Sequence, residues 1–523
     1  MGLIMSNISN VPTNEEKNAG VSQKEPIADA KLIQGSKKQK STKKSRDPST
    51  LTPEYIEEQR RQRNLKKEKK KQELLAQGID PNAVNTPVEL RFKTRELLEL
   101  PNNVASDDSF KIKIMSYNIL AQALIRRKLF PTSGNALKWS TRSQVLLSEF
   151  KHYDADILCL QELDFIQYNS YWRKELGKLG YDMKYYRADT KNHGLAIAFK
   201  SDKFICKHQS FMYYDKETSG ELRPRTATQN IGFLACLEFT PDILTKYSNI
   251  SRNGIIIGTT HLFWHPFGTF ERTRQTYLIL KKFKEFRSTM NTLKGNDDDW
   301  YGFFAGDFNS QPFDAPYLSI TAKPAHYAER ARIVLGCSLS YQYSKNRGVI
   351  DQEDDNGDED KENGQEEEGG NIEKFGSNQP KDPVPESFKP TTEQLKLVNS
   401  MEDLHNSLDM RAISLYSVGY KLVDPDNAGL DNNRDEPIFS NWAHAWRGLL
   451  DYIFVISSWD ATRESFSDKV DTVEDVEHNN GVRITKLLKL PLPKEMGPEP
   501  SGQPRLGQYP SDHLCLMAEV ALC

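Results

Sequence analysis

The sequence predicts an α/β fold whose strands are buried. Two stretches, WSTRSQVLLSEFKHY (139–153) and ERTRQTYLILKKFKEFRSTM (271–290), carry apolar residues at the three- and four-residue spacing of amphipathic helices. Short apolar runs of strand length lie around them, and strands that alternate with helices are typical of α/β domains. In chain order the strand-like runs are FKIKIMSYNIL (110–120), DILCLQEL (156–163), HGLAIAFK (193–200), NGIIIGTTHLFW (253–264), YGFFAGDFNS (301–310), GLLDYIFVIS (448–457) and DHLCLMAEVAL (512–522).

Length, cysteine pattern and hydropathy narrow the class of protein. The 523 residues, 37% of them hydrophobic, suffice for one large core or two ordinary ones, with additional tails. The six cysteines form no Cys-x-x-Cys pair and no signal peptide is evident, which indicates a reducing compartment. We therefore expect a cytoplasmic or nuclear protein that is not secreted. No window approaches ~18 apolar residues, so no membrane-spanning segment is expected, although the opening MGLIMS matches the myristoylation pattern at Gly2.

Charge is distributed unevenly along the chain and suggests its organisation. Residues 1–50 are polar and are predicted to be a disordered tail. Residues 51–105 are predicted to be a basic helix and a linker, with Thr52 as N-cap, Pro53 as first helical residue and Gly78 as the stop. The eight basic residues from Arg60 to Lys71 suit a polyanion such as RNA or a nuclear-import receptor, or they form a merely solvated helix.

The catalytic part of the chain is expected over residues 106–523, interrupted by an acidic insertion. Residues 351–370 hold eleven acids against one lysine and no hydrophobic residue. Such a segment cannot bury enough apolar surface to fold. We therefore predict a disordered insertion at about 342–390, inside the domain rather than between two domains.

Polar residues flank the ends of five strand-like runs. Asn-Ser and Ser-Asp after a strand are also ordinary turn chemistry, so each position is weak evidence alone. Together they suggest a ligand crevice, because such residues gather at one end of a packed sheet. The residues are Asn118, Glu162, His261, Asp307, Asn309, Asp512 and His513.

The types of these residues predict a particular chemistry. Carboxylates at Glu162 and Asp307, with amides at Asn118 and Asn309, suit Mg²⁺ or alternatively Mn²⁺ and disfavour zinc. An Asp-His pair beside carboxylate ligands is what metal-assisted phosphodiester hydrolysis requires. The sequence contains neither the phosphate-binding loop of nucleoside triphosphatases nor the Gly-x-Ser-x-Gly elbow of esterases.

Six motifs in fixed order carry a resemblance to a known family. They are SYNIL, LCLQEL, TTHLFWHP, FAGDFNSQP, RGLLDYIF and YPSDHLCLMAEV. The chain resembles the endonuclease/exonuclease/phosphatase superfamily over about residues 108–340 and 395–523. Within it, the chain looks like the deadenylase and nocturnin branch, and most like the fungal Ngl-type RNA exonucleases.

This resemblance implies a fold and an activity. The expected fold is the DNase I-like four-layer sandwich, in which two mixed β-sheets pack face to face with flanking helices. The expected activity is that of a Mg²⁺-dependent 3′→5′ exoribonuclease that releases 5′-nucleotides. Its substrates would be single-stranded RNA 3′ ends, such as rRNA precursor extensions, poly(A) tails or both, and the resemblance with the basic segment suggests a ribosome or pre-ribosome as partner.

The resemblance also assigns the metal and the attacking water. Glu162 resembles the principal metal ligand, with Asn118 as its neighbour and Asp307 as a further ligand. Asp307 would also orient or deprotonate the water. Whether one or two ions bind is left open by the sequence.

The phosphate-binding residues follow from the same comparison. Asn309 would bind phosphate, and His261 and His513 would hold the scissile phosphate. Asp512 would orient His513, while Asp451 would complete a second metal site or the histidine environment.

Base recognition is expected from stacking. Trp446 holds the position at which the family usually has a Phe that stacks on a base. Pro266 corresponds to the proline of the family's His-Pro motif. The replacement of Phe by Trp bears on the preference for adenine rather than on catalysis. Trp446 could equally be a core residue. His265 is predicted to cap its loop rather than to take part in catalysis.

Two rival functions remain open. One is a phosphatase of the same fold that acts on a nucleotide cofactor, as nocturnin-like proteins do. The motif Ser-Asp-His-Leu and Ser310 after the GDFN core argue against an inositol phosphatase. The other rival is an RNA-binding protein without catalytic activity. The presence of all the metal-binding and phosphate-binding residues argues against it.

Overall fold

The computed structural model describes residues 53–76, 87–101, 109–188, 191–295, 300–343, 380–460, 462, 465, 470–497 and 502–523. The predicted tail, Gly2 and residues 344–379 of the predicted insertion lie outside the described residues. The end of the insertion predicted at about 342–390 is ordered instead: residues 380–390 are described, and Phe388 packs against a cluster that includes Cys337.

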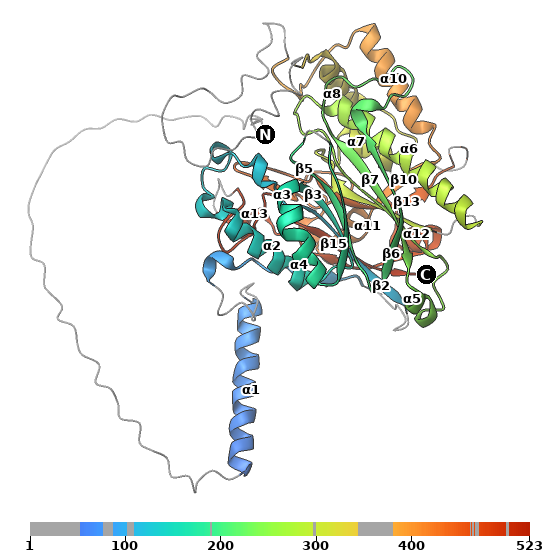
Figure 1. The fold of residues 1–523 in the computed structure, drawn as a ribbon. Helices are drawn as coiled ribbons and strands as arrows, with labels where there is room; N and C mark the ends of the chain where they lie inside the picture. Colours follow the sequence, from blue (N-terminus) through green and yellow to red (C-terminus); the bar gives the residue numbers. More distant parts are fainter. Residues whose placement is uncertain are drawn as a thin grey trace, which may run out of the picture. The chain divides into compact units, whose positions relative to one another are not determined.

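Two large sheets form the centre of the molecule (Figure 1). The seven-stranded sheet has the order β1 (Leu97–Glu99), β14 (Val482–Leu488), β15 (Leu516–Leu522), β2 (Phe110–Asn118), β3 (Ile157–Asp164), β5 (His193–Lys200), β4 (Tyr181–Tyr186). The six-stranded sheet has the order β10 (Met410–Ser414), β13 (Asp451–Ser458), β9 (Trp300–Asp307), β8 (Gly254–His261), β7 (Ile231–Phe239), β6 (Phe204–Tyr213). A small hairpin, β11 (Asn441–Ala443) and β12 (Trp446–Gly448), accompanies them.

The sheets pack face to face, and this contact is the main core. Along β2, Ile112 and Ile114 point inward and join a cluster with Ile257 and Phe303 of the other sheet. The alternate residue Met115 belongs to the outer face of its own sheet. Both faces of the strand are therefore buried, which explains why its sequence reads as a nearly continuous apolar run.

Helices cover the two outer faces (Figure 1). On the seven-stranded sheet, Leu146 and Phe150 of α2 (Trp139–Tyr153) pack with Leu158 of β3. On the six-stranded sheet, Phe283 of α6 (Thr269–Lys294) packs with Phe304 of β9. Among the described residues, the other α-helices are α3 (Phe165–Gln167), α4 (Arg173–Lys178), α5 (Pro241–Lys246), α7 (Ala315–Thr321), α8 (Glu329–Ser340), α10 (Thr392–Asn406), α11 (Leu415–Val423), α12 (Val473–Asn480) and α13 (Pro493–Met496). The four layers of the predicted DNase I-like sandwich are thus confirmed.

A separate basic helix, α1 (Pro53–Ala76), belongs to a structural unit of its own. The predicted N-cap Thr52 and the predicted stop Gly78 both lie outside the described residues. The described basic side chains of α1 are exposed, among them Arg60, Lys66 and Lys71. Across the described part of the chain, no helix has the length and apolar character needed to cross a membrane.

Strand direction brings the polar strand ends together. The pairs β2–β3 and β8–β9 are parallel, so their carboxyl ends meet at one edge, and β13 begins at that edge because it runs antiparallel to β9. Asp307 pairs in register with His261 on one side and with Asp451 on the other. In the other sheet, β15 runs antiparallel to β2, and its first residue Leu516 pairs with Ser116. The residues just before Leu516, among them His513, therefore lie at the carboxyl end of β2.

Candidate active site

Three predicted ligand residues from both sheets meet at this edge. The Asn118 amide lies between two carboxylates: its Nδ2 donates to Oε1 of Glu162 at 3.1 Å and to Oδ2 of Asp307 at 2.9 Å. Asn118 and Asp307 are each 1% exposed, whereas Glu162 is partly open to solvent. The amide thereby fixes the two acidic groups across the interface between the sheets.

The backbone at two of the site residues is unusual. Glu162 has φ 56° and Asn309 has φ 46°, both in the left-handed region that residues with a side chain seldom adopt. At Glu162 the register between β3 and β5 shifts between Leu160 and Leu163, so the strand carries a local irregularity. This irregularity aims the Glu162 carboxylate toward Asn118 and the N–H of Ala121, which donates to Oε2 at 3.0 Å.

The stretch Phe303–Pro312 ends β9 in a tight turn that also builds the site. Oδ1 of Asp307 accepts the backbone N–H of Asn309 at 2.8 Å. The Asn309 side chain donates in turn to the carbonyl of Leu262, just after β8, at 3.0 Å. The turn therefore binds only Oδ1 of Asp307, and Oδ2 faces Asn118 and the other site residues.

His261 lies between the two carboxylates. Its Nε2 is 3.5 Å from Oδ2 of Asp307, and its Nδ1 is 3.9 Å from Oε1 of Glu162. Burial lowers the pKa of His261 well below its usual range, and the nearby Lys191 and His513 act in the same direction. His261 is therefore neutral at physiological pH.

His513 is oriented by a different carboxylate from the one predicted. Its Nδ1 lies 2.8 Å from Oδ2 of Asp451, and its Nε2 lies 3.6 Å from Oδ2 of Asp307. Asp451, rather than Asp512, is thus the carboxylate that contacts the ring. His513 also forms a β-bridge with Asn441, whereas Oδ1 of Asp512 lies 3.5 Å from Oγ of Ser511.

The two histidines have opposite charge states. Burial works against protonation of His513, but the carboxylates of Asp451 and Asp307 outweigh it and raise its pKa well above the usual range. Burial also raises the pKa of Asp307 to about 7, with His513 opposing the shift and Asp451 adding to it. The site therefore combines a protonated imidazole with a neutral one.

Asp512 is buried next to the site, and among the described residues it forms no hydrogen bond with the candidate metal-binding carboxylates. It is 2% exposed, and its backbone carbonyl accepts the N–H of Trp442 at 2.8 Å. Burial raises the pKa of its carboxyl group, with His513 opposing the shift and Glu162 adding to it. Asp512 thus lies close enough to interact electrostatically with the Glu162 side of the site.

Sequence reasoning missed two buried residues that shape the site. Arg142 of α2 donates to the carbonyls of Pro510 at 2.7 Å and Leu120 at 2.5 Å, and so ties together two loops around Asn118 and His513. Ser440 donates to Oδ2 of Asp451 at 2.7 Å. An arginine within an amphipathic helix and a serine in a polar stretch carry no local signal, so only their contacts distinguish them.

The residues assigned to base binding are Trp446, which begins β12, and Pro266, which lies in the loop between β8 and α6. Trp446 and Pro266 are both half-buried, so Trp446 is neither a fully buried core residue nor fully exposed. His265 is buried, and its Nδ1 accepts the backbone N–H of Phe267 at 3.2 Å, which confirms the predicted loop cap. The neighbouring Trp264, which the sequence analysis did not single out, is 42% exposed.

The donor set suits a hard divalent cation. Ligand atoms of Asp307, Asp451 and His513 lie within 4.8 Å of one another, and because the His513 ring is protonated, the two carboxylates are the available donors of this group. The Asn118 contacts add the carboxylate of Glu162 beside Asp307. Oxygen donors dominate, and no cysteine is among them, as expected for Mg²⁺ or Mn²⁺ rather than zinc.

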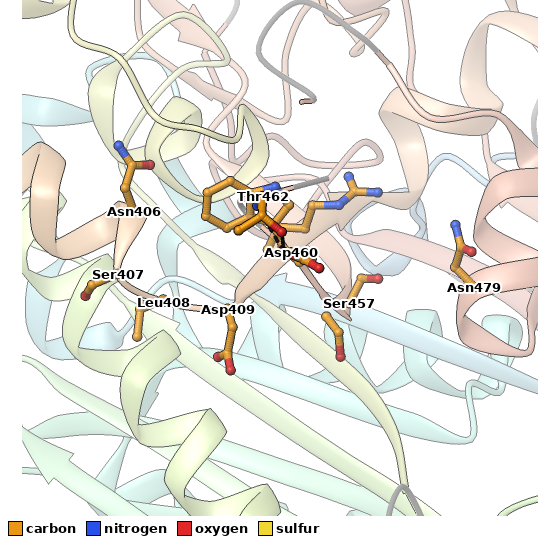
Figure 2. A pocket seen from close by; sticks show the side chains of 11 residues that line it. Asn406, Ser407, Leu408, Asp409, Ser457, Asp460, Thr462 and Asn479 are labelled. Atoms are coloured by element: carbon orange, nitrogen blue, oxygen red, sulfur yellow. Dashed lines mark hydrogen bonds between the residues drawn. The ribbon is translucent and has the colours of Figure 1, made fainter. Parts of the chain in front are cut away.

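A separate polar cavity lies at the opposite end of the six-stranded sheet. It has a volume of about 590 Å³ and is lined by residues that include Asn406, Asp409, Ser457 and Asp460 (Figure 2). Ser457 is at the end of β13, six residues beyond Asp451, which begins that strand. None of the catalytic candidates lines this cavity, so it is distinct from the site.

Comparison with known proteins identifies the family. The model of the endonuclease/exonuclease/phosphatase family matches residues 115–513. The RNA exonuclease NGL2 of Saccharomyces cerevisiae is 50% identical over 504 residues, covering 94% of this chain and 93% of that protein. The probable RNA exonuclease NGL3 of the same yeast is 38% identical over 485 residues, covering 90% of each.

Among solved structures, the chain is similar to ANGEL2, described as a 2′,3′-cyclic phosphatase in complex with adenosine-2′,3′-vanadate. The two share 20% sequence identity with a TM-score of 0.49, over 82% of this chain and 99% of that one. The family match includes strands of both sheets and every catalytic candidate, and the relatives named RNA exonucleases are similar over nearly their whole length. The chain therefore belongs to the endonuclease/exonuclease/phosphatase family of hydrolases.

Proposed function

We propose that this protein is a Mg²⁺-dependent 3′→5′ exoribonuclease that releases 5′-nucleotides from single-stranded RNA ends. The observation that carries the proposal is the Glu162–Asn118–Asp307 cluster beside the His513–Asp451 pair. The names of the relatives support RNA as the substrate class. Substrates of this kind include rRNA precursor extensions and poly(A) tails, which would bring the protein to ribosomes or pre-ribosomes.

The metal would be held mainly by Glu162 and Asp307, with Asn118 close by. When bound, one or two Mg²⁺ ions supply electrophilic assistance to the phosphoryl group and lower the pKa of a water molecule. Asn118 keeps the two carboxylates in place through its two hydrogen bonds. Mn²⁺ suits the same donors.

The remaining residues of the site have separate roles in the proposed reaction. Asp307 orients the attacking water and accepts its proton at Oδ2 as the water oxygen bonds to phosphorus. The P–O3′ bond to the preceding nucleotide breaks, and the 3′ oxygen that leaves takes up a proton from solvent. Protonated His513 donates from Nε2 to a non-bridging phosphoryl oxygen, while Asp451 accepts from Nδ1 and keeps the ring in that orientation. His261 and Asn309 contribute further contacts to the phosphate.

The terminal base is proposed to stack on Trp446, with Pro266 as a second contact. The indole lies against the backbone of Gly448: a Cβ there would be 2.8 Å from Cη2 of Trp446 and 3.2 Å from Oε1 of Gln311. The absence of a side chain at Gly448 thus makes room for the ring. Stacking on such a ring contributes about 1–3 kcal/mol per base and tolerates any base, so we expect cleavage of both adenine and mixed-sequence ends.

The test is digestion of 5′-labelled RNAs that end in A₂₀, in U₂₀ and in mixed sequence, with and without Mg²⁺. Wild-type protein should produce ladders that shorten from the 3′ end. Glu162→Gln keeps the shape of the side chain but removes its charge, and should lower the rate on the order of 10³-fold or more. Full activity in Glu162→Gln would refute the site assignment, and no shortening of any RNA would point to nucleotide-cofactor phosphates as substrates.

A further inference from the structure

Ser440, just before β11, has a hydroxyl group whose hydrogen bonds are all defined. The residue is 0% exposed. Its Oγ accepts the backbone N–H groups of Leu450 at 3.0 Å and Asp451 at 3.1 Å. A hydroxyl has two acceptor positions and one proton. Both acceptor positions are used, so the proton is directed to the remaining neighbour, Oδ2 of Asp451, at 2.7 Å.

The Asp451 carboxylate is held on one side only. Oδ2 accepts from Ser440 and faces Nδ1 of His513. Its other oxygen, Oδ1, is buried and has no hydrogen-bond partner among the described residues. Without the Ser440 hydroxyl, only His513 would restrain rotation of the carboxylate about its Cβ–Cγ bond.

The backbone of Ser440 links the same two segments. Its N–H donates to the carbonyl of Gly448 at 3.1 Å, and its carbonyl accepts the N–H of Leu514 at 2.7 Å. One residue therefore contacts the start of β13, which carries Asp451, and the chain next to His513.

We infer that Ser440 is a positioning residue, which fixes the Asp451 carboxylate so that His513 presents Nε2 toward Asp307. The inference rests on the proposed function, because it assigns Ser440 a part in the same phosphodiester hydrolysis. A purely structural role in the β11 loop is the competing explanation. The two differ in kinetics, since a positioning residue changes kcat and a loosened loop changes stability and substrate binding.

The kinetic test uses the full chain, Mg²⁺ and a 5′-labelled RNA ending in A₂₀. Ser440→Ala is expected to lower kcat roughly 10- to 100-fold with KM within about twofold of wild type, because one charge-assisted hydrogen bond is lost. Ser440→Thr retains the hydroxyl and should restore most of the rate. The matched control is Ser319→Ala, which removes another fully buried hydroxyl, one that donates to the carbonyl of Ala315 at 2.5 Å in α7, and should leave kcat unchanged.

A double-mutant cycle separates the two explanations further. If Ser440 acts through Asp451, Ser440→Ala combined with Asp451→Asn should be no slower than Asp451→Asn alone. Additive losses of rate would overturn the inference, as would a Ser440→Ala protein with wild-type kcat.

Crystal structures of wild type and Ser440→Ala give a readout that does not depend on activity. The 2.8 Å contact between Asp451 and His513 should be lost in Ser440→Ala and kept in Ser440→Thr. An unchanged contact in Ser440→Ala would refute the inference even if no RNA were cleaved by the wild type. Inactivity of the wild type toward RNA would refute the proposed function instead, so the two failures are distinguishable.

Discussion

At the scale of single residues, Glu162 and Asn309 occupy left-handed backbone conformations. Each such conformation costs about 1–3 kcal/mol and persists only where the surrounding structure imposes it. Here the imposing contacts are the hydrogen bonds to Glu162 from Asn118 and Ala121 and those between Asn309, Asp307 and Leu262. The strain coincides with two of the catalytic candidates, as is common at functional sites.

The contact between Asp451 and His513 predicts the effect of one substitution. Asp451→Asn should lower kcat on the order of 10²–10⁴-fold, because the amide no longer stabilises the protonated ring in its orientation. Steady-state cleavage of labelled RNA measures this loss. Asp409→Asn, an exposed carboxylate at the far end of the same sheet, is the control and should be silent. A much larger loss in Asp512→Asn than in Asp451→Asn would return the orienting role to Asp512.

At the scale of secondary structure, the parallel pair β8–β9 sets the distance between His261 and Asp307. Gly306 precedes Asp307, and a Cβ at this position would lie 2.3 Å from the carbonyl oxygen of Thr260 on the adjacent strand. The close approach of the two backbones therefore requires glycine. This explains the Gly-Asp sequence at the end of β9 in terms of packing rather than turn formation.

Gly306→Ala is expected to force the two strands apart. Overpacking against a neighbouring side chain costs about 1–3 kcal/mol, and a backbone atom yields less readily, so the free energy of unfolding should fall by at least about 2 kcal/mol. Activity should fall with it, because His261 moves away from Asp307. Urea unfolding measures the first effect, with Gly177→Ala in α4, where no atom lies within 4 Å of the added Cβ, as control. Equal unfolding midpoints for the two variants would contradict the argument.

At the scale of the whole molecule, the buried acid Glu149 couples folding to pH. It lies in α2, accepts a hydrogen bond from the Tyr117 hydroxyl at 2.9 Å, and is 1% exposed. Burial raises its pKa from 4.5 to about 7, against the opposing influence of Arg95 and of the Tyr117 hydrogen bond. The folded state therefore retains the proton to higher pH than the unfolded state does.

Glu149→Gln should change the pH dependence of stability. In wild type, the contribution of Glu149 is fully present below pH 4.5 and is lost as the pH rises through about 7. The variant cannot ionise here, so its stability relative to wild type should increase between those pH values, by at most about 3 kcal/mol, and then level off. Urea unfolding at several pH values tests this, with the exposed Glu285→Gln as control. A difference that does not vary with pH would exclude the effect.

The basic helix α1 predicts a salt-dependent contribution to RNA binding. Removing residues 1–80 should weaken binding of single-stranded RNA and flatten its dependence on salt, because each lost phosphate contact lowers the slope by about 0.7. The measurement is RNA affinity between low and moderate salt, in the Glu162→Gln background to prevent cleavage. The turnover of bound RNA should not change in the truncated wild type. Equal slopes would make α1 a docking element for a protein such as an import receptor.

The sequence by itself determined the local features of this protein. The seven apolar runs predicted β2, β3, β5, β8, β9, β13 and β15, but not the other strands of the two sheets. The polar residues at the ends of these runs suggested Asn118, Glu162, His261, Asp307 and His513, which the structure brings close together. These predictions succeeded because strand length, side-chain alternation and turn chemistry depend on a few consecutive residues.

Only the tertiary structure decided which groups pair. His513 is adjacent in sequence to Asp512, yet its ring contacts Asp451, 62 residues away. Ser440 and Arg142 acquire their positions in the same way, through loops that converge on the edge of two sheets. The physical reason is that pairing between strands far apart in the sequence sets such contacts: the antiparallel pairing of β13 with β9 brings Asp451 beside Asp307 and within reach of His513.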